Sequence, residues 1–354
     1  MATDLLALTA ELIDVPSVSY DEREIADLLE RRLAAVPWLT VDRVGDNVVA
    51  RTQLGRPSRL LLVGHTDTVP ANDNDRSRIE GDVVWGLGAS DMQGGIAVFL
   101  DLAERIDQPA VDVSYVFYAC EEVTGADSGL ELLFRERPDL LEGELAVLGE
   151  PTDGVLEAGC QGTMRLAVTL TGARAHTARP WMGRNAVHRL GRLLAVVETF
   201  EPRRPVLDGC EYREALQAVR VEGGVASNVV PDRATVTLNR RYAPDRDAAA
   251  AEAEVRALLA PVLEDGDTVE VLDAVDGAPP SLSDPLLAAL TARLDVRAKL
   301  GWTDVARFAA RGIAAVNLGP GDPLLAHNAD ERVDRESLER TSATLEALLR
   351  GELL

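Results

Sequence analysis

Cysteine and histidine are both scarce in this sequence of 354 residues, with three and four copies respectively. Cys120, Cys160 and Cys210 are widely spaced and form no Cys-x-x-Cys pair. This pattern excludes a disulfide framework and a thiolate zinc site, and it predicts buried free thiols. The sequence also lacks the Gly-x-Ser-x-Gly motif of many serine hydrolases and the His-Glu-x-x-His motif of mononuclear zinc proteases, which argues against both classes.

The sequence also has few basic residues relative to acidic ones and no long apolar segment. Lysine and arginine together number 36 against 59 aspartate and glutamate residues, so the net charge is -23. Such an acidic chain is expected to bind neither nucleic acid nor an anionic membrane. No apolar run reaches the length of a transmembrane helix, and the amino terminus lacks a basic signal region, so we expect a cytoplasmic protein. The length predicts two domains.

The first and last parts of the chain alternate between strand and helix patterns. Short apolar or β-branched runs, typical of strands buried on both faces, occur at 59–63, 113–119, 145–148 and 314–318. Amphipathic segments follow most of them. Repetition of strand, loop and helix predicts an α/β fold, in which a mostly parallel sheet is covered by helices.

The pattern changes within 163–276. Apolar residues alternate with polar ones at 166–170, which predicts a strand with one exposed face. Helical spacing at 185–199 and 247–263 accompanies further alternating segments. We therefore expect a small inserted α+β unit with two helices on an antiparallel sheet. The catalytic domain would consist of the two flanking segments, 1–162 and 277–354.

Acids and a histidine follow the predicted buried strands. They lie just beyond three strand ends or at the turn into a helix, and they are His65, Asp67, Asp91, Glu121, Glu122 and Glu150. Because the carboxyl ends of parallel strands meet at one sheet edge, we expect these side chains to gather there. Asp67 can support the His65 ring, since positions i and i+2 of an extended segment point the same way. So many carboxylates would repel one another unless cations neutralise them.

Imidazoles and carboxylates together suit a pair of zinc ions, with cobalt or manganese as alternatives and calcium disfavoured. A dinuclear site lowers the pKa of a water molecule and polarises a carbonyl, which leaves one acid to move the proton. The doublet Glu121 and Glu122 fits this division, because neighbouring residues leaving a strand point in different directions. Gly86-x-Gly88 begins like a dinucleotide-binding loop, but Asp91 at the third glycine position would repel a pyrophosphate.

The motifs resemble those of the aminoacylase and carboxypeptidase G-like dinuclear zinc peptidases over nearly the whole chain. In order, they are Gly64-His65-Thr66-Asp67-Thr68-Val69-Pro70, Gly86-x-Gly88-x-x-Asp91-Met92, Glu121-Glu122, Gly149-Glu150-Pro151 and Ala326-His327. One departure is Gln93, where the family most often has lysine.

The resemblance implies two Zn2+ ions per subunit, with Co2+ as an alternative, and it implies a role for each matching residue. Asp91 would bridge the two ions. His65 and Glu150 would complete one coordination sphere, and Glu122 and His327 would complete the other. The resemblance further implies that Glu121 is the general acid and base and that Asp67 orients His65.

The inserted unit resembles the family's dimerisation lid, which implies a homodimer through 163–276. Within it, 172–180 resembles a motif whose histidine stabilises the oxyanion in the partner subunit's active site, which makes His176 the candidate for that role. Asn228, Arg241 and Thr303 lie in segments that resemble substrate-binding ones, and arginine suits a substrate carboxylate.

The substrate is a small acyl amino acid by the same resemblance. Segments such as Gln161-Gly162-Thr163 and Asn317-x-Gly319-Pro320-Gly321 resemble the family's desuccinylases more than its deacetylases or carboxypeptidases. This implies hydrolysis of N-succinyl-LL-2,6-diaminopimelate in lysine biosynthesis. The alternatives are N-acetylornithine deacetylation, cleavage of another N-acyl amino acid or dipeptide, and a non-catalytic protein that binds metal or an acyl amino acid.

Overall fold

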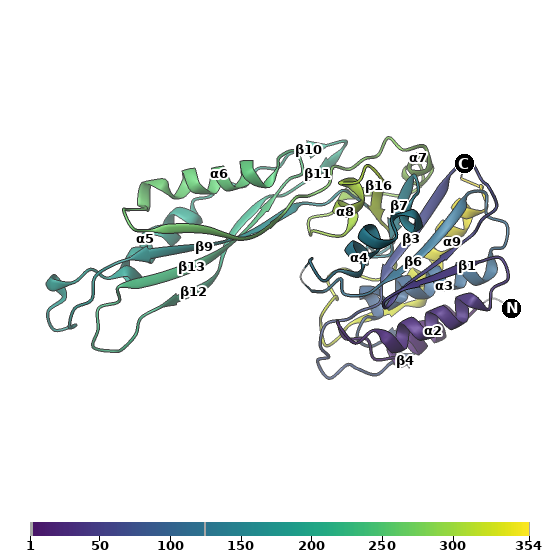
Figure 1. Cartoon of the computed structure of the whole chain (residues 1–354), viewed down its shortest axis with the longest axis horizontal. Coiled ribbons are helices and arrows are strands. Elements are labelled where there is room, and N and C mark those ends of the chain that lie inside the picture. Colours follow the sequence, from purple (N-terminus) through teal and green to yellow (C-terminus); the bar gives the residue numbers. More distant parts are fainter. Residues whose placement is uncertain (1–2, 124, 354) are drawn as a thin grey trace. The chain divides into compact units, whose positions relative to one another are not determined.

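The computed structural model describes residues 3–123 and 125–353, which form two compact units (Figure 1). Of the described residues, the first unit comprises 3–123, 125–158, Ser281–Arg297 and 307–353, and the second comprises Gly159–Pro280 and Ala298–Ala306. The expected inserted segment, 163–276, lies inside the second unit. The second unit also contains residues 159–162, 277–280 and Ala298–Ala306, which fall within the segments assigned to the catalytic domain from the sequence, and Ala298–Ala306 carries Thr303.

The first unit is built on an eight-stranded sheet. In spatial order the strands are β1 (Thr40–Val44), β2 (Asn47–Arg51), β6 (Asp112–Tyr118), β3 (Arg59–His65), β7 (Leu145–Leu148), β16 (Ala314–Asn317), β8 (Leu156–Ala158) and β15 (Val296–Ala298). The four central strands, β6, β3, β7 and β16, are parallel, whereas β1, β2 and β8 pair antiparallel with their neighbours. The predicted α/β fold is confirmed, and its parallel part is the centre of the sheet.

The central strands of this sheet are largely buried and mostly apolar, as expected where helices cover both faces. The four residues Leu60 to Val63 of β3 are all fully buried, as expected for a strand covered on both faces. The helices of the unit are α1 (Leu5–Ile13), α2 (Arg23–Ala34), α3 (Gly94–Arg105), α4 (Gly129–Glu136), α7 (Pro285–Thr291) and α9 (Arg335–Leu349), and α8 (Val305–Ala309) spans the boundary with the second unit. Helices α1, α3 and α9 pack against one another, and α3 contacts β3 and β6.

A separate three-stranded sheet in the first unit connects distant parts of the chain. Its order is β17 (Arg332–Asp334), β5 (Val83–Trp85) and β4 (Arg78–Glu80), and both pairings are antiparallel. Through β17 and β5, the segment after His327 lies beside the segment that leads to Asp91.

The second unit is an antiparallel sheet with two helices, as predicted. The strand order is β12 (Ala215–Gly223), β13 (Arg233–Tyr242), β9 (Gly162–Thr171) and β14 (Thr268–Val275). Helices α5 (Ala186–Glu198) and α6 (Ala248–Leu259) contact each other and the sheet. Alternating residues of β9, including Leu166, Val168 and Leu170, are buried beneath them in the core of this unit, which is the pattern of a sheet with one covered face.

Within the described part of the chain, no helix is both long and apolar enough to cross a membrane. The three cysteines are buried and free, as predicted from their spacing.

Candidate metal centre

Three adjacent parallel strands bring the predicted acids and histidine to one edge of the sheet. The register pairs His65, the last residue of β3, with Tyr118, the last residue of β6, and pairs Val63 with Leu148 at the end of β7. The loops after these three strands therefore begin at the same edge of the sheet. They carry Asp67, the doublet of Glu121 and Glu122, and Glu150 respectively.

Potential ligand atoms of these residues form three groups, in each of which all atoms lie within 4.8 Å of one another. The groups are His65, Asp91 and Glu150; Asp91, Glu122 and His327; and His65, Glu121 and Glu122. The first two correspond to the two ligand sets implied by the sequence motifs, and Asp91 is the residue they share. A carboxylate common to both sets is placed to bridge two ions, since its two oxygens can bind separate metals.

Asp67 contacts both the doublet of Glu121 and Glu122 and the ring of His65. Its carboxylate is completely buried and accepts hydrogen bonds from the backbone N–H groups of Glu121 (2.9 Å) and Glu122 (3.0 Å) and from the Ser19 hydroxyl (2.8 Å). Its Oδ1 lies 3.5 Å from His65 Nδ1, and its backbone carbonyl lies 3.0 Å from the same nitrogen. Burial alone would raise the pKa of Asp67, but these interactions lower it to about 2.

The two site histidines are held among carboxylates, which favour their charged forms. Burial alone would lower the pKa of His65, yet hydrogen bonds to Asp67 and Asp91 raise it well above its usual value. A hydrogen bond from His327 Nε2 to Glu122 Oε1 (2.7 Å), together with the charge of Asp91, raises the pKa of His327 to about 9. In the ion-free protein, protons therefore provide positive charge at positions that a metal ion would otherwise occupy.

The segment that carries Asp91 packs closely against the residues that follow β7. Asp91 lies in a kinked turn, Ala89–Gln93, immediately before α3, where the backbone of Asp91 and Met92 is not helical and the peptide bond between them is cis. Gly95, at the start of α3, has no space for a side chain, because a Cβ there would collide with the carbonyl oxygen of Gly149. Glycine at this position allows the Asp91 turn to approach the Glu150 loop closely.

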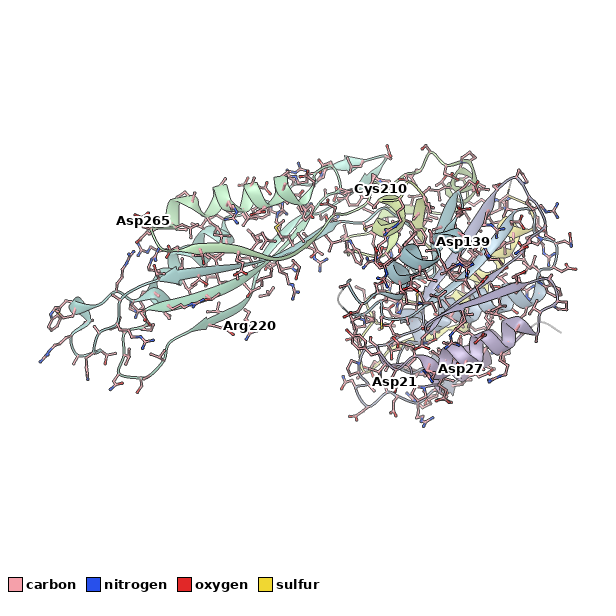
Figure 2. All side chains as sticks on the ribbon, in the orientation of Figure 1. Asp21, Asp27, Asp139, Cys210, Arg220 and Asp265 are labelled. Carbon is pink, nitrogen blue, oxygen red and sulfur yellow. The ribbon has the colours of Figure 1, made fainter. Side chains whose placement is uncertain are left out.

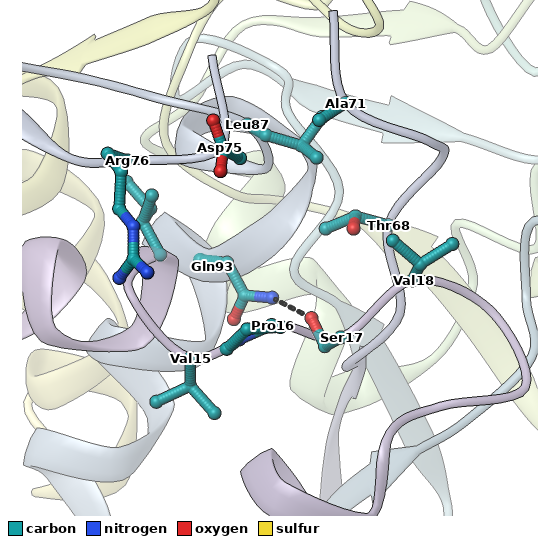
Figure 3. A pocket seen from close by; sticks show the side chains of 11 residues that line it. Val15, Pro16, Ser17, Val18, Thr68, Ala71, Asp75, Arg76, Leu87 and Gln93 are labelled. Atoms are coloured by element: carbon teal, nitrogen blue, oxygen red, sulfur yellow. Dashed lines mark hydrogen bonds between the residues drawn. The ribbon is translucent and has the colours of Figure 1, made fainter. Parts of the chain in front are cut away.

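Gln93, the departure from the family pattern, is a structural link between ligand segments. Its Nε2 donates to the carbonyl oxygen of Thr66 (3.1 Å) and to the Ser17 hydroxyl (3.5 Å), as Figure 3 shows for the second bond. It lines a cavity of about 100 Å³ together with Thr68 and several apolar side chains. The amide thus ties the His65 loop to the Asp91 turn, and it belongs to none of the three ligand groups described above.

The donor set fits a pair of zinc ions. Imidazole nitrogens and carboxylate oxygens are ordinary zinc ligands, and mixed donors of this kind disfavour calcium. The clustered acids also need positive charge beyond that of two histidines. The residues that would hold the ions are His65, Asp91, Glu122, Glu150 and His327.

The remaining predicted site residues, His176, Asn228, Arg241 and Thr303, all lie in the second unit. His176 and Asn228 are both exposed. Their segments lie side by side, since the Thr177 N–H donates to the Asn228 carbonyl oxygen (3.0 Å). Thr303 is 4% exposed, and its hydroxyl has no hydrogen-bond partner among the described residues.

Two buried glutamates that support the site escaped the sequence analysis. Glu331 Oε1 accepts hydrogen bonds from the N–H groups of Ser90 (3.0 Å) and Asp91 (2.9 Å). Glu22 Oε1 accepts the N–H of Cys120 (3.0 Å), the residue before Glu121 and Glu122. Neither follows a predicted strand, so the strand-end pattern offered no signal for them.

Sequence comparisons identify a family model and relatives that match most of this chain. The model of peptidase family M20/M25/M40 matches residues 61–351. A Mycobacterium tuberculosis protein provisionally named a succinyl-diaminopimelate desuccinylase is 52% identical over 335 residues, which cover 93% of each chain. The Corynebacterium glutamicum succinyl-diaminopimelate desuccinylase is 42% identical, with 98% of this chain and 96% of the relative covered.

Solved structures share the fold at low sequence identity. A Staphylococcus aureus tripeptidase superposes with a TM-score of 0.80 at 20% identity, covering 99% of this chain and 98% of the other. A dinuclear metal-binding M20 peptidase from Bacillus subtilis gives 0.71 at 16% identity, covering 99% and 97%. From the family match and the two relatives together, we conclude that this chain belongs to peptidase family M20/M25/M40 and is a hydrolase.

Proposed function

We propose that this protein hydrolyses N-succinyl-LL-2,6-diaminopimelate to succinate and LL-2,6-diaminopimelate, using two zinc ions per subunit with cobalt as an alternative. The similarity to relatives named for this activity, 52% and 42% identical over almost the full chain, carries the proposal. The intact ligand groups at the sheet edge support it. The three free cysteines suit the reducing cytoplasm, where we place the reaction.

Zinc ions held by the two ligand groups would acidify a water molecule and polarise the amide carbonyl. The chain's own contribution is the proton transfer. Glu122 is engaged with His327 and belongs to the group that contains Asp91. Its neighbour Glu121 is assigned to take a proton from the attacking water and deliver it to the leaving amine nitrogen.

The assay that tests this proposal compares two substrates on the purified, zinc-loaded protein. Release of free amine from N-succinyl-LL-2,6-diaminopimelate and from N-acetylornithine is followed side by side. We expect kcat/KM to favour the succinylated substrate by at least about a hundredfold, because a site built to pair the succinyl carboxylate is left unpaired by an acetyl group. A preference for acetylornithine would identify a deacetylase, and turnover of neither would favour a binding protein.

Arg241 is proposed to bind a substrate carboxylate. Its neighbour Arg240 is fully buried, and Arg240 Nη2 lies 2.6 Å from the carboxylates of both Glu214 and Glu254. Arg241 points to the other face of β13, as consecutive strand residues do. It has no ion-pair partner within the described residues, and burial lowers its pKa. A partly buried guanidinium without a carboxylate suits an anionic ligand.

Replacing Arg241 with lysine should therefore raise KM for the succinylated substrate about tenfold to a hundredfold while leaving metal content unchanged. The expected loss is that of a charge-assisted, two-pronged hydrogen bond. Steady-state kinetics provide the measurement. The matched control is Arg165→Lys, because Arg165 is exposed on the neighbouring strand β9 and already pairs with Asp273. Equal effects of the two variants would contradict the assignment.

His176 is proposed to donate a hydrogen bond to the oxyanion in the partner subunit's site. Its Nδ1 accepts the N–H of Ala178 (3.1 Å), so the neutral ring carries its proton on Nε2 and presents a donor there. Asn228 and the unpartnered hydroxyl of Thr303 are proposed to contact substrate. All three assignments follow the family resemblance.

A homodimer through the second unit is proposed on the basis of an open sheet edge. Strand β12 is one of the two edge strands of this sheet, and Val219 and Val221 on it are 58% and 53% exposed. Arg220, labelled in Figure 2, lies between them. An unpaired strand carrying exposed valines is a template for another strand, and a second copy of the chain offers the same edge.

The double change Val219→Lys and Val221→Lys should convert the dimer to a monomer, because it places charge on an edge that would be buried. Light scattering coupled to size exclusion gives the mass. Val206→Lys is the control, since Val206 is equally exposed, at 62%, on the separate hairpin β10 (Val206–Leu207).

A mixing experiment tests the transfer of His176 between subunits. Inactive His176→Ala and Glu121→Gln proteins, once their subunits have exchanged, should recover activity, because one site of each mixed dimer then has both residues. Absence of recovery despite exchange would contradict the role in the partner subunit.

A further inference from the structure

We propose that Glu331 is a positioning residue that fixes Asp91 without binding metal itself, an inference that rests on the dinuclear site proposed above. Glu331 is 1% exposed and belongs to none of the three described ligand groups. One of its carboxylate oxygens, Oε1, accepts hydrogen bonds from the N–H groups of both Ser90 (3.0 Å) and Asp91 (2.9 Å). It therefore fixes the backbone from which the shared ligand Asp91 extends.

The main chain of Glu331 strengthens the same connection. Its carbonyl oxygen accepts the N–H of Gly86 (3.0 Å), and its own N–H donates to the carbonyl oxygen of Asn328 (3.1 Å). Asn328 directly follows His327, whose Nε2 lies 3.6 Å from Asp91 Oδ2. Glu331 thus joins two ligand-bearing segments that are more than two hundred residues apart in the sequence.

A neighbouring contact supports the view that the whole turn is anchored here. The Ser90 hydroxyl donates to the carbonyl oxygen of Arg332 (2.8 Å), one residue beyond Glu331. Ser90 is fully buried, so its N–H has no access to water if the Glu331 oxygen is withdrawn. The turn would then have to move to satisfy that group, because an unpaired buried donor is unfavourable. Movement of the turn displaces Asp91, and with it one ligand of each proposed ion.

Two substitutions of Glu331 separate the effect of side-chain length from the effect of charge. Aspartate keeps the negative charge, but its oxygen falls about 1.5 Å short, one carbon–carbon bond. Glutamine keeps the reach and an acceptor oxygen but loses the charge. If Glu331 positions Asp91 through its hydrogen bonds, Glu331→Asp should weaken zinc binding about tenfold to a hundredfold, the usual effect of losing a partner of a metal ligand. Glu331→Gln should stay within a few-fold of the wild type.

Zinc affinity is measured on the full-length protein by competition with a chromophoric chelator, so the readout does not depend on knowing the substrate. Glu157→Ala is the matched control, because Glu157 is also a buried glutamate of the first unit but binds Arg297 (2.9 Å). This control should leave zinc affinity unchanged. Wild-type affinity in Glu331→Asp, or a loss in Glu331→Gln as large as that in Glu331→Asp, would overturn the proposal.

A measurement on the unmodified protein covers the case in which Glu331→Asp fails to fold. In the metal-free wild type, the amides of Ser90 and Asp91 should exchange slowly with solvent deuterium, and rapid exchange at both would overturn the inference. A wild-type protein that binds fewer than two zinc ions yet protects these amides would refute the dinuclear function and leave the anchoring role intact. Failure of the proposed dinuclear function can therefore be told apart from failure of the proposed role of Glu331.

Discussion

Replacing Glu121 with glutamine is expected to abolish turnover while both metal ions stay bound. The substitution preserves size and hydrogen-bonding capacity but removes the group that accepts the proton. General acid–base catalysis contributes about a hundredfold to ten-thousandfold, and Glu121 is proposed to serve in both the attack and the departure of the amine. We therefore expect kcat to fall by at least about a thousandfold with little change in KM. Stopped assays for free amine and metal analysis by mass spectrometry provide the two readouts.

The adjacent residue supplies the matched control for this prediction. Glu122→Gln makes the same chemical change one position along the chain, but Glu122 hydrogen bonds to His327 and shares a ligand group with Asp91. It should lose metal as well as activity. Retention of more than a tenth of wild-type turnover in Glu121→Gln, or loss of metal from it, would contradict the division of roles within the doublet.

The arrangement of the site could be predicted from sequence because it depends on buried strands. The apolar runs that became β3, β6 and β7 are adjacent and parallel, so the residues after them had to meet at one edge. The kinked turn with Asp91 and the distant His327 complete two of the groups. Asp91 was expected at this edge from its place at the turn into a helix, whereas His327 entered through the family motifs.

Very short strands, and acids whose role is to accept hydrogen bonds, could not be predicted from local sequence patterns. Strands β8 and β15 have only three residues each, too few to show a period. Glu22 directly precedes α2, but its side chain accepts the N–H of Cys120 and does not cap the helix. Glu331 resembles an ordinary loop acid in the sequence, and its contacts with Ser90 and Asp91 span about 240 residues. Long-range partners of single side chains leave no local pattern.

Asp91→Ala and His327→Ala are expected to lose different numbers of metal ions. Asp91 belongs to both of the ligand groups that would each hold an ion, whereas His327 belongs to one. The first change should therefore reduce zinc to less than one ion per subunit, and the second should leave about one. Activity should fall at least about a thousandfold in both, since each removes a ligand of the dinuclear site. His188→Ala, on the exposed surface of α5, should retain two ions and full activity.

Metal binding should also depend on pH in a direction set by the histidines. The pKa of His327 is raised to about 9 in the ion-free protein, and that of His65 is raised as well. Only the neutral rings bind zinc, so each must lose its proton first. The apparent affinity should rise as pH increases from 7 toward 9, by up to about tenfold per pH unit for each displaced proton. In weakly buffered solution at pH 7, zinc should release protons, and His327→Ala should release fewer than the wild type. Equal release from both would mean that His327 is not a ligand, because its proton would then have no reason to leave.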